Sequence, residues 1–253
     1  MKLTNKQLDK YSRQIILKNI GPVGQKKILN SKVLIVGMGG LGSPISIYLA
    51  AAGVGNIGIV DFDKVNLSNL QRQILFNNSD INKSKTSSAL KKLKKINPDI
   101  KIYEFNKKLN HLNINKIAKN FDIIADASDN FETRFLLNSY SLINKKILIV
   151  GAISKFEGHI YTFNFKNFKN SPCLRCFIPD IPVGIDENCD YEGIIGSLAG
   201  TIGSIQANEI IKEILGIGKT LCGNILIIDS LKLNFRKIKL NKNHQCIECS
   251  KYK

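Results

Sequence analysis

The sequence predicts an α/β protein whose mixed sheet is parallel in its N-terminal part and antiparallel in its C-terminal part, with helices on both faces. Short β-branched runs alternate with helical segments up to residue 153, which is typical of parallel βαβ units. Beyond residue 153 one strand follows another across a short turn, which indicates antiparallel pairing. The 253 residues are enough for a single domain with a full core, and the chain shows no repeat or linker.

The chain is basic, and its formal net charge of +17 invites a nucleic-acid interpretation. However, only five of the 37 basic residues are arginine, the lysines are scattered, and Asn and Ile are also abundant. A coding bias explains this pattern, and the lysines of residues 91–95 are expected on the solvated face of a helix. We therefore expect no nucleic-acid partner, while steering of an acidic protein partner stays open.

Residues 33–60 carry no charge, a property that would also suit a membrane span. Glycines, a proline and an asparagine divide this stretch into strand, turn, helix and strand. The first five residues lack the apolar core of a signal peptide. We therefore expect a cytoplasmic protein without membrane association.

Residues 5–17 are predicted to form one helix, with Leu8, Tyr11 and Ile15 on one side. Arg13 lies within this segment and stands out because arginine is scarce in the chain. Residue types alone leave open whether Arg13 is a surface charge or a functional cation.

A glycine-rich turn joins the first predicted strand to a helix. Strand 33–36 runs into Gly37-Met38-Gly39-Gly40-Leu41-Gly42, which has the pattern G-x-G-x-x-G. Ser43 is expected to cap the helix and Pro44 suits its first turn, while Gly53 ends it. A second apolar strand, 57–60, then leads directly into Asp61.

This turn suits the binding of a nucleotide. Glycines let backbone N–H groups approach a phosphate, and the helix N-terminus adds about half a positive charge. An acid about 20 residues further on can accept hydrogen bonds from ribose hydroxyls, and Asp61 stands at that spacing. The alternative is a glycine-rich βαβ corner that binds nothing. We predict a Rossmann-like sheet with its nucleotide-binding part at residues 31–153.

The middle of the chain continues the alternation of helices and strands. Residues 64–73 are dense in amides and contain Arg72, another scarce arginine. The elements predicted next are a helix at 83–95 that Pro98 ends, a strand at 100–105, a helix at 114–120 and a strand at 123–126.

A polar cluster, Ala127-Ser128-Asp129-Asn130, follows that last strand and precedes a helix that extends through Asn144. Open α/β sheets bind ligands at the carboxyl ends of their strands. Asp129 is therefore a candidate magnesium ligand, and its alternative role is a helix N-cap.

The C-terminal part, 154–253, is expected to change to antiparallel pairing. A turn at 156–158 separates strands 147–153 and 159–165, and strands 225–229 and 233–240 close the chain. A helix at 194–215 carries many small residues on one face, which indicates close packing in the core or at a dimer contact. That helix is not predicted to cross a membrane, because Gln206, Asn208, Glu209 and Lys212 interrupt it.

Two C-x-x-C pairs, Cys173/Cys176 and Cys246/Cys249, match a tetrahedral zinc site with four thiolate ligands. Disulfides or a redox pair are the alternatives. Four thiolates leave the metal no open position, so the zinc is expected to be structural and to pin the C-terminal tail to the loop that holds Cys173.

These motifs together resemble the ThiF/MoeB/HesA family, bacterial relatives of ubiquitin-activating enzymes, over essentially the whole chain. The resemblance is carried by Arg13, the glycine turn, Asp61, Ser68-Asn69-Leu70-Gln71-Arg72-Gln73, Asp129-Asn130 and both cysteine pairs. It implies ATP-dependent adenylation of the C-terminal glycine of a ubiquitin-like sulfur carrier protein, on the way to thiamine or molybdopterin. The sulfur is expected from a separate donor protein.

The resemblance also implies roles for individual residues. Asn69, Arg72 and Lys85 would contact the phosphates, Asp61 the ribose, and Asp129 a magnesium ion. Arg13 matches an arginine that family members place on the ATP of a dimer partner, which implies a homodimer. The full nucleotide-binding set is Gly37, Gly39, Gly40, Gly42, Asp61, Ser68, Asn69, Arg72, Lys85, Asp129 and Asn130, and the catalytic set is Arg13, Arg72, Lys85, Asp129 and Cys189.

Two further cysteines are less well defined. Cys189 lies in the mobile loop of the family, where the thiamine branch has a cysteine that can link covalently to the carrier. An idle exposed thiol is the alternative for Cys189. Cys222 matches no family position and is expected to be structural.

The proposed chemistry explains which residue types are missing. A C-terminal carboxylate has a pKa of about 3.5, so it is already ionised at neutral pH and needs no general base. The sequence accordingly shows no Ser-His-Asp or Cys-His arrangement among its three histidines. ATP carries about four negative charges, and Arg72, Lys85, Arg13 and magnesium are the expected counter-charges.

Three other functions stay open at this point. A nicotinamide-dependent (NAD) dehydrogenase shares the glycine turn and Asp61 but does not need Arg72, Lys85 and four paired cysteines. A tRNA threonylcarbamoyladenosine dehydratase also adenylates a carboxylate, and the charge of +17 slightly favours it. A non-catalytic scaffold would not need every nucleotide-facing position filled.

Overall fold

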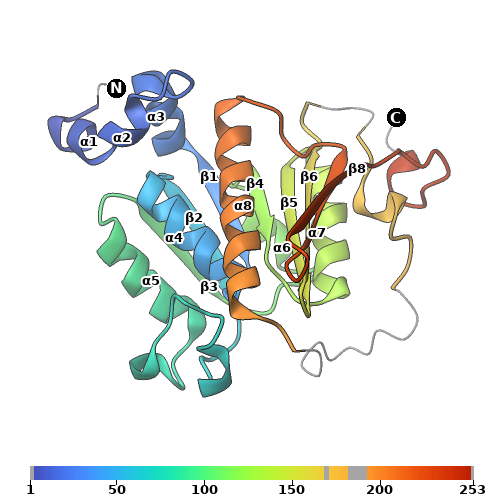
Figure 1. The fold of residues 1–253 in the computed structure, drawn as a ribbon, viewed down its shortest axis with the longest axis horizontal. Helices are drawn as coiled ribbons and strands as arrows, with labels where there is room; N and C mark the ends of the chain where they lie inside the picture. Colours follow the sequence, from blue (N-terminus) through green and yellow to red (C-terminus); the bar gives the residue numbers. More distant parts are fainter. Residues whose placement is uncertain (1–2, 168–170, 182–192, 252–253) are drawn as a thin grey trace.

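The computed structural model describes residues 3–167, 171–181 and 193–251. Its centre is an eight-stranded sheet with the strand order β3-β2-β1-β4-β5-β6-β7-β8, and Figure 1 shows helices around it. The mixed sheet predicted from the sequence is confirmed. The strands are β1 Lys32–Val36, β2 Asn56–Asp61, β3 Lys101–Asn106, β4 Ile123–Asp126, β5 Ile147–Ser154, β6 Glu157–Asn164, β7 Asn224–Asp229 and β8 Asn234–Lys239.

Strands β3, β2, β1, β4 and β5 are parallel neighbours. Strand β1 lies between β2 and β4, and Val33 pairs with Ile57 on one side and with Ile123 on the other. The chain moves outward from β1 to β2 and β3, then returns to the other side for β4. The strand order therefore reverses between β1 and β4, and open α/β sheets bind ligands in the crevice at the carboxyl ends of two such strands.

The pairing changes direction after β5, as predicted. Strands β5, β6, β7 and β8 are antiparallel neighbours, and Ser154 pairs with Glu157 at the tight end of the β5–β6 hairpin. Lys155 in this turn has a φ of 52°. The turn therefore lies one to two residues before the predicted position, and β6 begins at Glu157 instead of His159.

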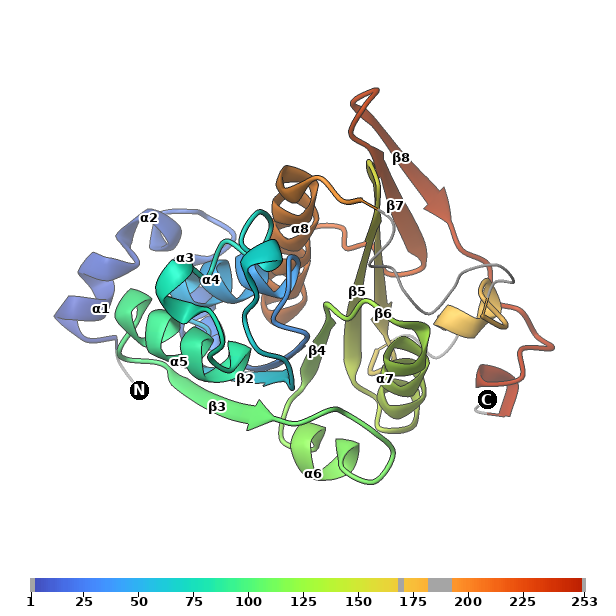
Figure 2. The same ribbon diagram turned by 90° about the horizontal axis from the view of Figure 1, so that it is seen from below.

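The helices cover both faces of the sheet, which Figure 2 shows edge-on. On one face Ile28, Leu49, Leu93 and Ile202 belong to one apolar core, and on the other Leu137 belongs to a second core. The helices are α1 Asn5–Lys10, α2 Ser12–Ile15, α3 Gly21–Asn30, α4 Gly42–Ala52, α5 Lys85–Ile96, α6 Ile114–Ala118, α7 Phe131–Ile143 and α8 Gly196–Leu215.

The N-terminal region departs from the prediction of one helix over residues 5–17. Two short helices, α1 and α2, meet at Tyr11, whose φ of −103° and ψ of 13° interrupt the helix. Tyr11 is buried, and its ring lies against Gly53, so tertiary packing decides the break. Helix α3 was not predicted, because its first residues, Gly21-Pro22-Val23-Gly24, resemble a loop.

The cap of helix α4 also differs from the prediction. The helix begins at Gly42 after Leu41, and no side chain caps it. Ser43 instead donates a hydrogen bond from Oγ to the carbonyl of Gly39, 2.7 Å away. The assignment of Ser43 as the N-cap was therefore wrong, whereas Gly53 ends the helix in the left-handed conformation as predicted.

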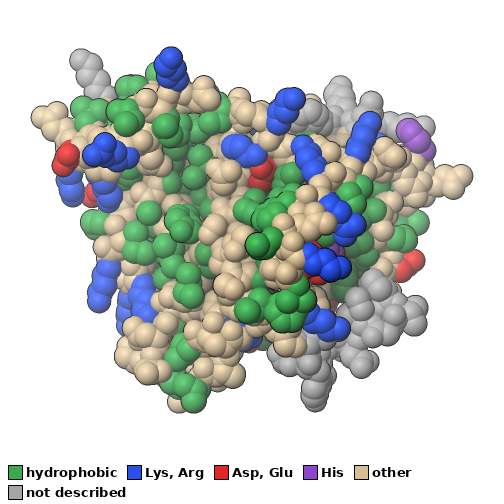
Figure 3. Space-filling view, viewed as in Figure 1, with side chains coloured by type: hydrophobic (Ala, Val, Ile, Leu, Met, Phe, Trp, Pro, Cys, Tyr) green, Lys and Arg blue, Asp and Glu red, His purple; other side chains and the backbone are tan. Residues whose placement is uncertain are grey.

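Helix α8 uses its small residues to pack in the core. A Cβ on Gly203 would lie 2.4 Å from Pro44 Cγ, and the side chain of Ile202 fills the space beside Gly158 on β6. Among the described residues, no helix combines the length and the apolar character that a bilayer crossing needs. Lysine and arginine side chains are spread over the face shown in Figure 3, as their scatter along the sequence implies.

Candidate functional site

The glycine turn lies at the crevice and has little room for side chains. Gly37 has a φ of 94°, and a Cβ there would lie 2.5 Å from the carbonyl oxygen of Ala127. A Cβ on Gly42 would lie 1.9 Å from the Gly37 carbonyl oxygen. A Cβ on Gly40 would come within 3.2 Å of Ala199 on α8. The turn is therefore clamped between the end of β4 and α8, and it requires glycine.

Asp61, at the end of β2, holds the turn in place. One carboxylate oxygen accepts a hydrogen bond from the backbone N–H of Met38 at 2.7 Å, and the other accepts from Asp63 at 2.9 Å. The sequence suggested a ribose contact for Asp61, and that contact stays a prediction. Organisation of the turn is a second role that the motif spacing did not reveal.

The turn presents backbone donors next to the N-terminus of α4. For the N–H groups of Gly39, Gly40 and Leu41, no acceptor is found among the described residues. These donors and the positive end of the helix favour an anion, as a phosphate would be. The predicted nucleotide cradle thus has the expected donors.

The two cations predicted to contact the phosphates come from different segments. Arg72 passes its side chain over Gly40, where a Cβ would lie 3.5 Å from Arg72 Cγ, and its guanidinium donates to the carbonyl of Ser68 at 3.1 Å. Lys85 is the first residue of α5, and its Nζ lies 2.8 Å from Oδ2 of Asp63. The Lys85 side chain is only 8% exposed, whereas that of Asp63 is 49% exposed.

Asn69 and Asn130 both serve as local caps in this structure. Asn69 closes the 3-10 turn Leu67–Asn69 by accepting from the backbone N–H of Asn66 at 3.1 Å. Asn130 is the N-cap of α7, and it accepts from the N–H of Thr133 at 2.9 Å. The alternative of an N-cap at Asp129 is therefore wrong, and Asp129 remains a candidate metal ligand. Its Oδ1 accepts from the Asn130 amide at 3.2 Å.

A buried ion pair lies beside this loop, and the sequence interpretation missed it. Oδ2 of Asp126 at the end of β4 lies 3.4 Å from Nε of Arg134 on α7, and both side chains are buried. Burial raises the pKa of Asp126, while Arg134 and the hydrogen bonds from Ser128 oppose that rise. The scarcity of arginine, which drew attention to Arg13 and Arg72, was also the available signal for Arg134.

Arg13 does not lie at the crevice of its own chain. It is exposed on α2, which follows Tyr11, and Tyr11 packs on Gly53 at the C-terminal end of α4. The glycine turn is at the opposite end of this helix, whose 11 residues span about 16 Å. Arg13 is thus separated from the turn of its own chain by the length of α4.

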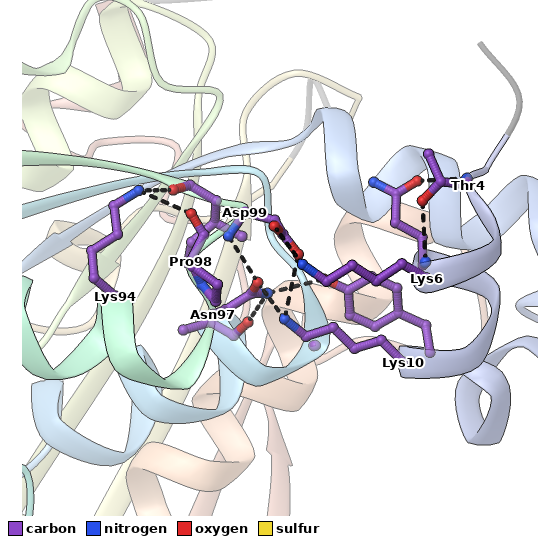
Figure 4. A network of polar contacts seen from close by, with 12 residues as sticks. Thr4, Lys6, Lys10, Lys94, Asn97, Pro98 and Asp99 are labelled. Carbon is purple, nitrogen blue, oxygen red and sulfur yellow. Dashed lines mark hydrogen bonds and ion pairs between the residues drawn. The ribbon is translucent and has the colours of Figure 1, made fainter.

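Figure 4 shows the polar contacts that hold this N-terminal segment. Buried Asn97 donates to the hydroxyl of Tyr11 at 2.9 Å and to the carbonyl of Ala50 at 2.8 Å. Lys10 donates to Oδ1 of Asn97 at 2.5 Å, and Lys6 pairs with Asp99 at 3.4 Å. The position of α1 and α2 relative to α4 is therefore well defined.

The two cysteine pairs come together, as predicted. The four Sγ atoms of Cys173, Cys176, Cys246 and Cys249 lie within 4.8 Å of one another. The Sγ of Cys173 is 3.6 Å from that of Cys246, and the Sγ of Cys176 is 3.4 Å from that of Cys249. These four cysteines are free thiols, so a disulfide is excluded in this structure.

The spacing of the sulfur atoms fits a tetrahedral metal site. Zinc–sulfur bonds of about 2.3 Å give sulfur–sulfur edges of about 3.8 Å. Burial and the neighbouring thiols raise the pKa of Cys173, so a cation is needed to stabilise four thiolates here. The donor set therefore suits a metal ion.

Two cysteines, Cys189 and Cys222, are not among the predicted metal ligands. Cys189 lies outside the described residues, so its predicted covalent role is untested. Cys222 is half-buried, and its Sγ lies 3.8 Å from Oγ of Ser171. This environment agrees with the structural role expected for Cys222.

The glycine turn, the adjacent cations and the thiol cluster define a Rossmann-like nucleotide-binding protein with a four-cysteine centre. The ThiF family profile matches residues 11–248, and the chain belongs to the ThiF family. The resemblance stated from the motifs is therefore confirmed.

Several characterised relatives are similar over nearly the whole chain. The chain is 39% identical to the sulfur carrier protein adenylyltransferase of Thermus thermophilus, over 98% of this chain and 93% of that protein. It is 40% identical to the SAMP-activating enzyme E1 of Haloferax volcanii, with 96% and 89% covered. It is 42% identical to the adenylyltransferase and sulfurtransferase MOCS3 of Culex quinquefasciatus, of which it spans 57%.

Solved structures support the same fold at lower identity. Escherichia coli MccB with ATP has a TM-score of 0.82 and 23% identity, over 95% of this chain and 74% of that chain. MccB with AMPCPP and MccA has a TM-score of 0.84, also at 23% identity, over 98% and 75%. At this identity the likeness shows the fold alone.

Proposed function

We propose that this chain uses ATP to adenylate the C-terminal glycine carboxylate of a ubiquitin-like sulfur carrier protein, with release of pyrophosphate. The observation that carries this proposal is the near full-length similarity to the sulfur carrier protein adenylyltransferase of Thermus thermophilus. The glycine turn and its two neighbouring cations supply a site of the required chemistry. The similar curated proteins named above are adenylyltransferases or activating enzymes and not dehydrogenases or scaffolds.

The glycine turn would hold the phosphates through its backbone donors. Arg72 above Gly40 and Lys85 beside Asp63 would neutralise the charge that develops on departing pyrophosphate. Asp63 keeps the Lys85 ammonium in place until the nucleotide arrives. Magnesium, held by Asp129, would supply further positive charge at the phosphates.

The carrier carboxylate would attack the α-phosphorus without a general base, because it is ionised at neutral pH. Catalysis would then depend on the alignment of carboxylate and phosphate and on charge neutralisation. This agrees with a crevice that is lined by backbone donors and fixed cations.

The enzyme would act as a homodimer in which Arg13 reaches the nucleotide of the partner. The support is that Arg13 lies beyond the far end of α4 from its own glycine turn. Large apolar side chains of the same N-terminal segment are exposed, with Ile16 at 70% and Val23 at 68%, as a contact surface would require. The polar network of Figure 4 would hold α2, and therefore Arg13, in a fixed position relative to α4.

The four cysteines would hold a structural zinc, which ties the C-terminal tail to the loop after β6. Free buried thiols agree with a reducing cytoplasm, where we place the enzyme. A separate protein would deliver the sulfur, and Cys189 would link to the carrier if the thiamine-type reaction applies. The choice between a thiamine-type and a molybdopterin-type carrier is left to experiment.

The decisive experiment mixes the purified chain with ATP, magnesium and ubiquitin-like carriers of both types. A carrier that gains the mass of one adenylate, together with carrier-dependent exchange of pyrophosphate into ATP, would support the proposal. Carriers without their terminal glycine serve as the control. Adenylation of a tRNA threonylcarbamoyl group, with both carriers left unmodified, would replace the proposal with the dehydratase activity.

A further inference from the structure

The buried pair of Asp126 and Arg134 has no part in the mechanism above. The Asp126 side chain is fully buried and the Arg134 side chain is 9% exposed. Such a pair loses its hydration, and an apolar pair of similar volume is often as stable or more stable. Stability alone is therefore a weak reason for two buried charges at the carboxyl end of β4.

The contacts of this pair converge on one residue, Ser128. Oδ1 of Asp126 accepts from the backbone N–H of Ser128 at 2.9 Å and from its Oγ at 2.5 Å. Nη2 of Arg134 donates to the carbonyl of Ser128 at 3.1 Å. Both backbone groups of Ser128 are thus held by the two members of the ion pair.

Arg134 also connects Ser128 to the neighbouring strand. The same Nη2 donates to the carbonyl of Gly151 on β5 at 3.2 Å, and the guanidinium lies 5.5 Å from the ring centre of Phe131. Arg134 belongs to the first turns of α7, whose N-cap is Asn130. One side chain therefore joins β5, the loop after β4 and the start of α7.

The residue after Ser128 is Asp129. The carbonyl of Ser128 belongs to the peptide that enters Asp129, and this peptide is planar. A fixed carbonyl therefore fixes the positions of the amide nitrogen and the Cα of Asp129. Asp129 itself follows the carboxyl end of β4, between this held peptide and the Asn130 cap.

We propose that Arg134, through its pair with Asp126, is a positioning residue that fixes the Ser128–Asp129 peptide at the rim of the nucleotide site. The role of Asp129 rests on the proposed function, whereas the immobilisation of the peptide does not. A purely structural role, in which Arg134 only attaches α7 to the sheet, predicts a different experimental result.

Lys146 provides a matched control at the amino end of β5, the end of the strand opposite to Gly151. Its Nζ donates to the carbonyls of Lys119 at 2.9 Å and Phe121 at 2.6 Å, just before β5 begins. It is thus a cation that ties a loop to β5 through two carbonyls, as Arg134 does, but away from the crevice. Lys146→Met should lower stability without affecting the Ser128 amide.

The experiment compares Arg134→Met, Arg134→Lys and Lys146→Met in the full chain. The first readout is amide hydrogen exchange of Ser128 and Asp129 without nucleotide, and the second is the affinity for AMPCPP with magnesium. Arg134→Met should speed exchange and weaken affinity about tenfold each, because a hydrogen bond to a charged group is lost next to an open loop. Arg134→Lys should give intermediate values, and Lys146→Met should match the wild type in both readouts.

The inference is overturned if Arg134→Met melts earlier, as Lys146→Met does, while its Ser128 exchange and AMPCPP affinity stay at wild-type values. If Arg134→Met does not fold, Arg134→Lys and Asp126→Asn carry the same comparison. A wild-type chain that binds AMPCPP but adenylates no carrier would count against the proposed function alone, since the exchange readout needs no carrier.

Discussion

The parallel and antiparallel halves of the sheet are stabilised in different ways. Strands β1 and β4 of the parallel half are buried almost along their whole length and are covered by helices on both faces. Strand β8 at the other edge is exposed at all six positions. The antiparallel half instead gains order from stacked aromatic rings, such as Tyr161 and Phe177, and from the four-cysteine centre.

The predicted nucleotide-binding residues and the four-cysteine centre lie in different halves of the molecule. The predicted phosphate-binding residues lie in the half whose central strands are buried. The half that ends the chain has an exposed edge strand and holds the four-cysteine centre. A perturbation of one half should therefore leave a measurable signature that the other half does not share.

Removal of the metal should have the largest effect and should be confined to one half. Structural zinc contributes on the order of 10 kcal/mol in small domains. Chelation, or Cys249→Ser, should release the metal and remove hydrogen-exchange protection around Cys173 and in the tail. The β1 and β4 amides should keep their protection.

Metal content and site-resolved hydrogen exchange would check this expectation, with Cys222→Ser as the control cysteine. Equal loss of hydrogen-exchange protection in both halves would contradict the separate stabilisation of the parallel and antiparallel halves. Lost AMPCPP binding with an intact tail would mean that the centre is not structural.

Gly42→Ala should act on the parallel half with the next largest effect. The added Cβ would meet the carbonyl oxygen of Gly37 at 1.9 Å, so the backbone must shift at the glycine turn. We expect a loss of about 3 to 5 kcal/mol of unfolding free energy. Gly200→Ala is the matched control, because nothing lies within 4 Å of its Cβ position. Denaturant unfolding of both variants measures the effect, and equal stability of the two would refute it.

Lys85→Met should reduce activity with little change in stability. Loss of one fixed charge at a transition state costs about 3 kcal/mol, or about a hundredfold in rate. The pair with half-exposed Asp63 contributes little to folding. Carrier-dependent pyrophosphate exchange and thermal melting would separate the two effects. A variant with wild-type exchange would remove Lys85 from the proposed machinery.

The smallest effect concerns pH and the antiparallel half. Burial raises the pKa of Tyr161 to about 12, above its ordinary value of 10.0. The folded state therefore holds this proton more tightly, so its stabilising contribution is complete below pH 10 and is lost as the pH rises toward 12. A pKa that is higher by about two corresponds to about 2 to 3 kcal/mol of unfolding free energy. In Tyr161→Phe, the fall in unfolding free energy that Tyr161 causes between pH 10 and 12 should be absent. Denaturant unfolding of both proteins at each pH would measure this difference.

The sequence allowed accurate prediction wherever local pattern and tertiary packing agree. Strand β4 was predicted at Ile123–Asp126, because three apolar residues are followed by an acid that ends the run. The glycine turn and the cysteine centre also followed from spacing, since backbone geometry and metal geometry restrict residue types strongly.

Prediction failed where distant contacts decide the local structure. Helix α3 begins with residues typical of a loop and forms because Gly24 packs closely against Leu215. Tyr11 divides the N-terminal helix because its ring reaches Gly53. Asp126 and Arg134 were missed as a pair because their relation depends on the direction of α7 and not on a motif.

Helix α8 connects the two halves of the sheet. It packs on α4 beside the glycine turn. The side-chain amide of Gln206 donates to the carbonyl of Asp126 at 3.0 Å, and the carboxylate of Glu209 accepts from the hydroxyl of Thr162 on β6 at 3.0 Å. In the part of the chain that the structure describes, α8 thus bridges both halves of one continuous sheet and leaves no hinge there between two lobes. We therefore expect turnover to depend on surface loops instead of lobe closure.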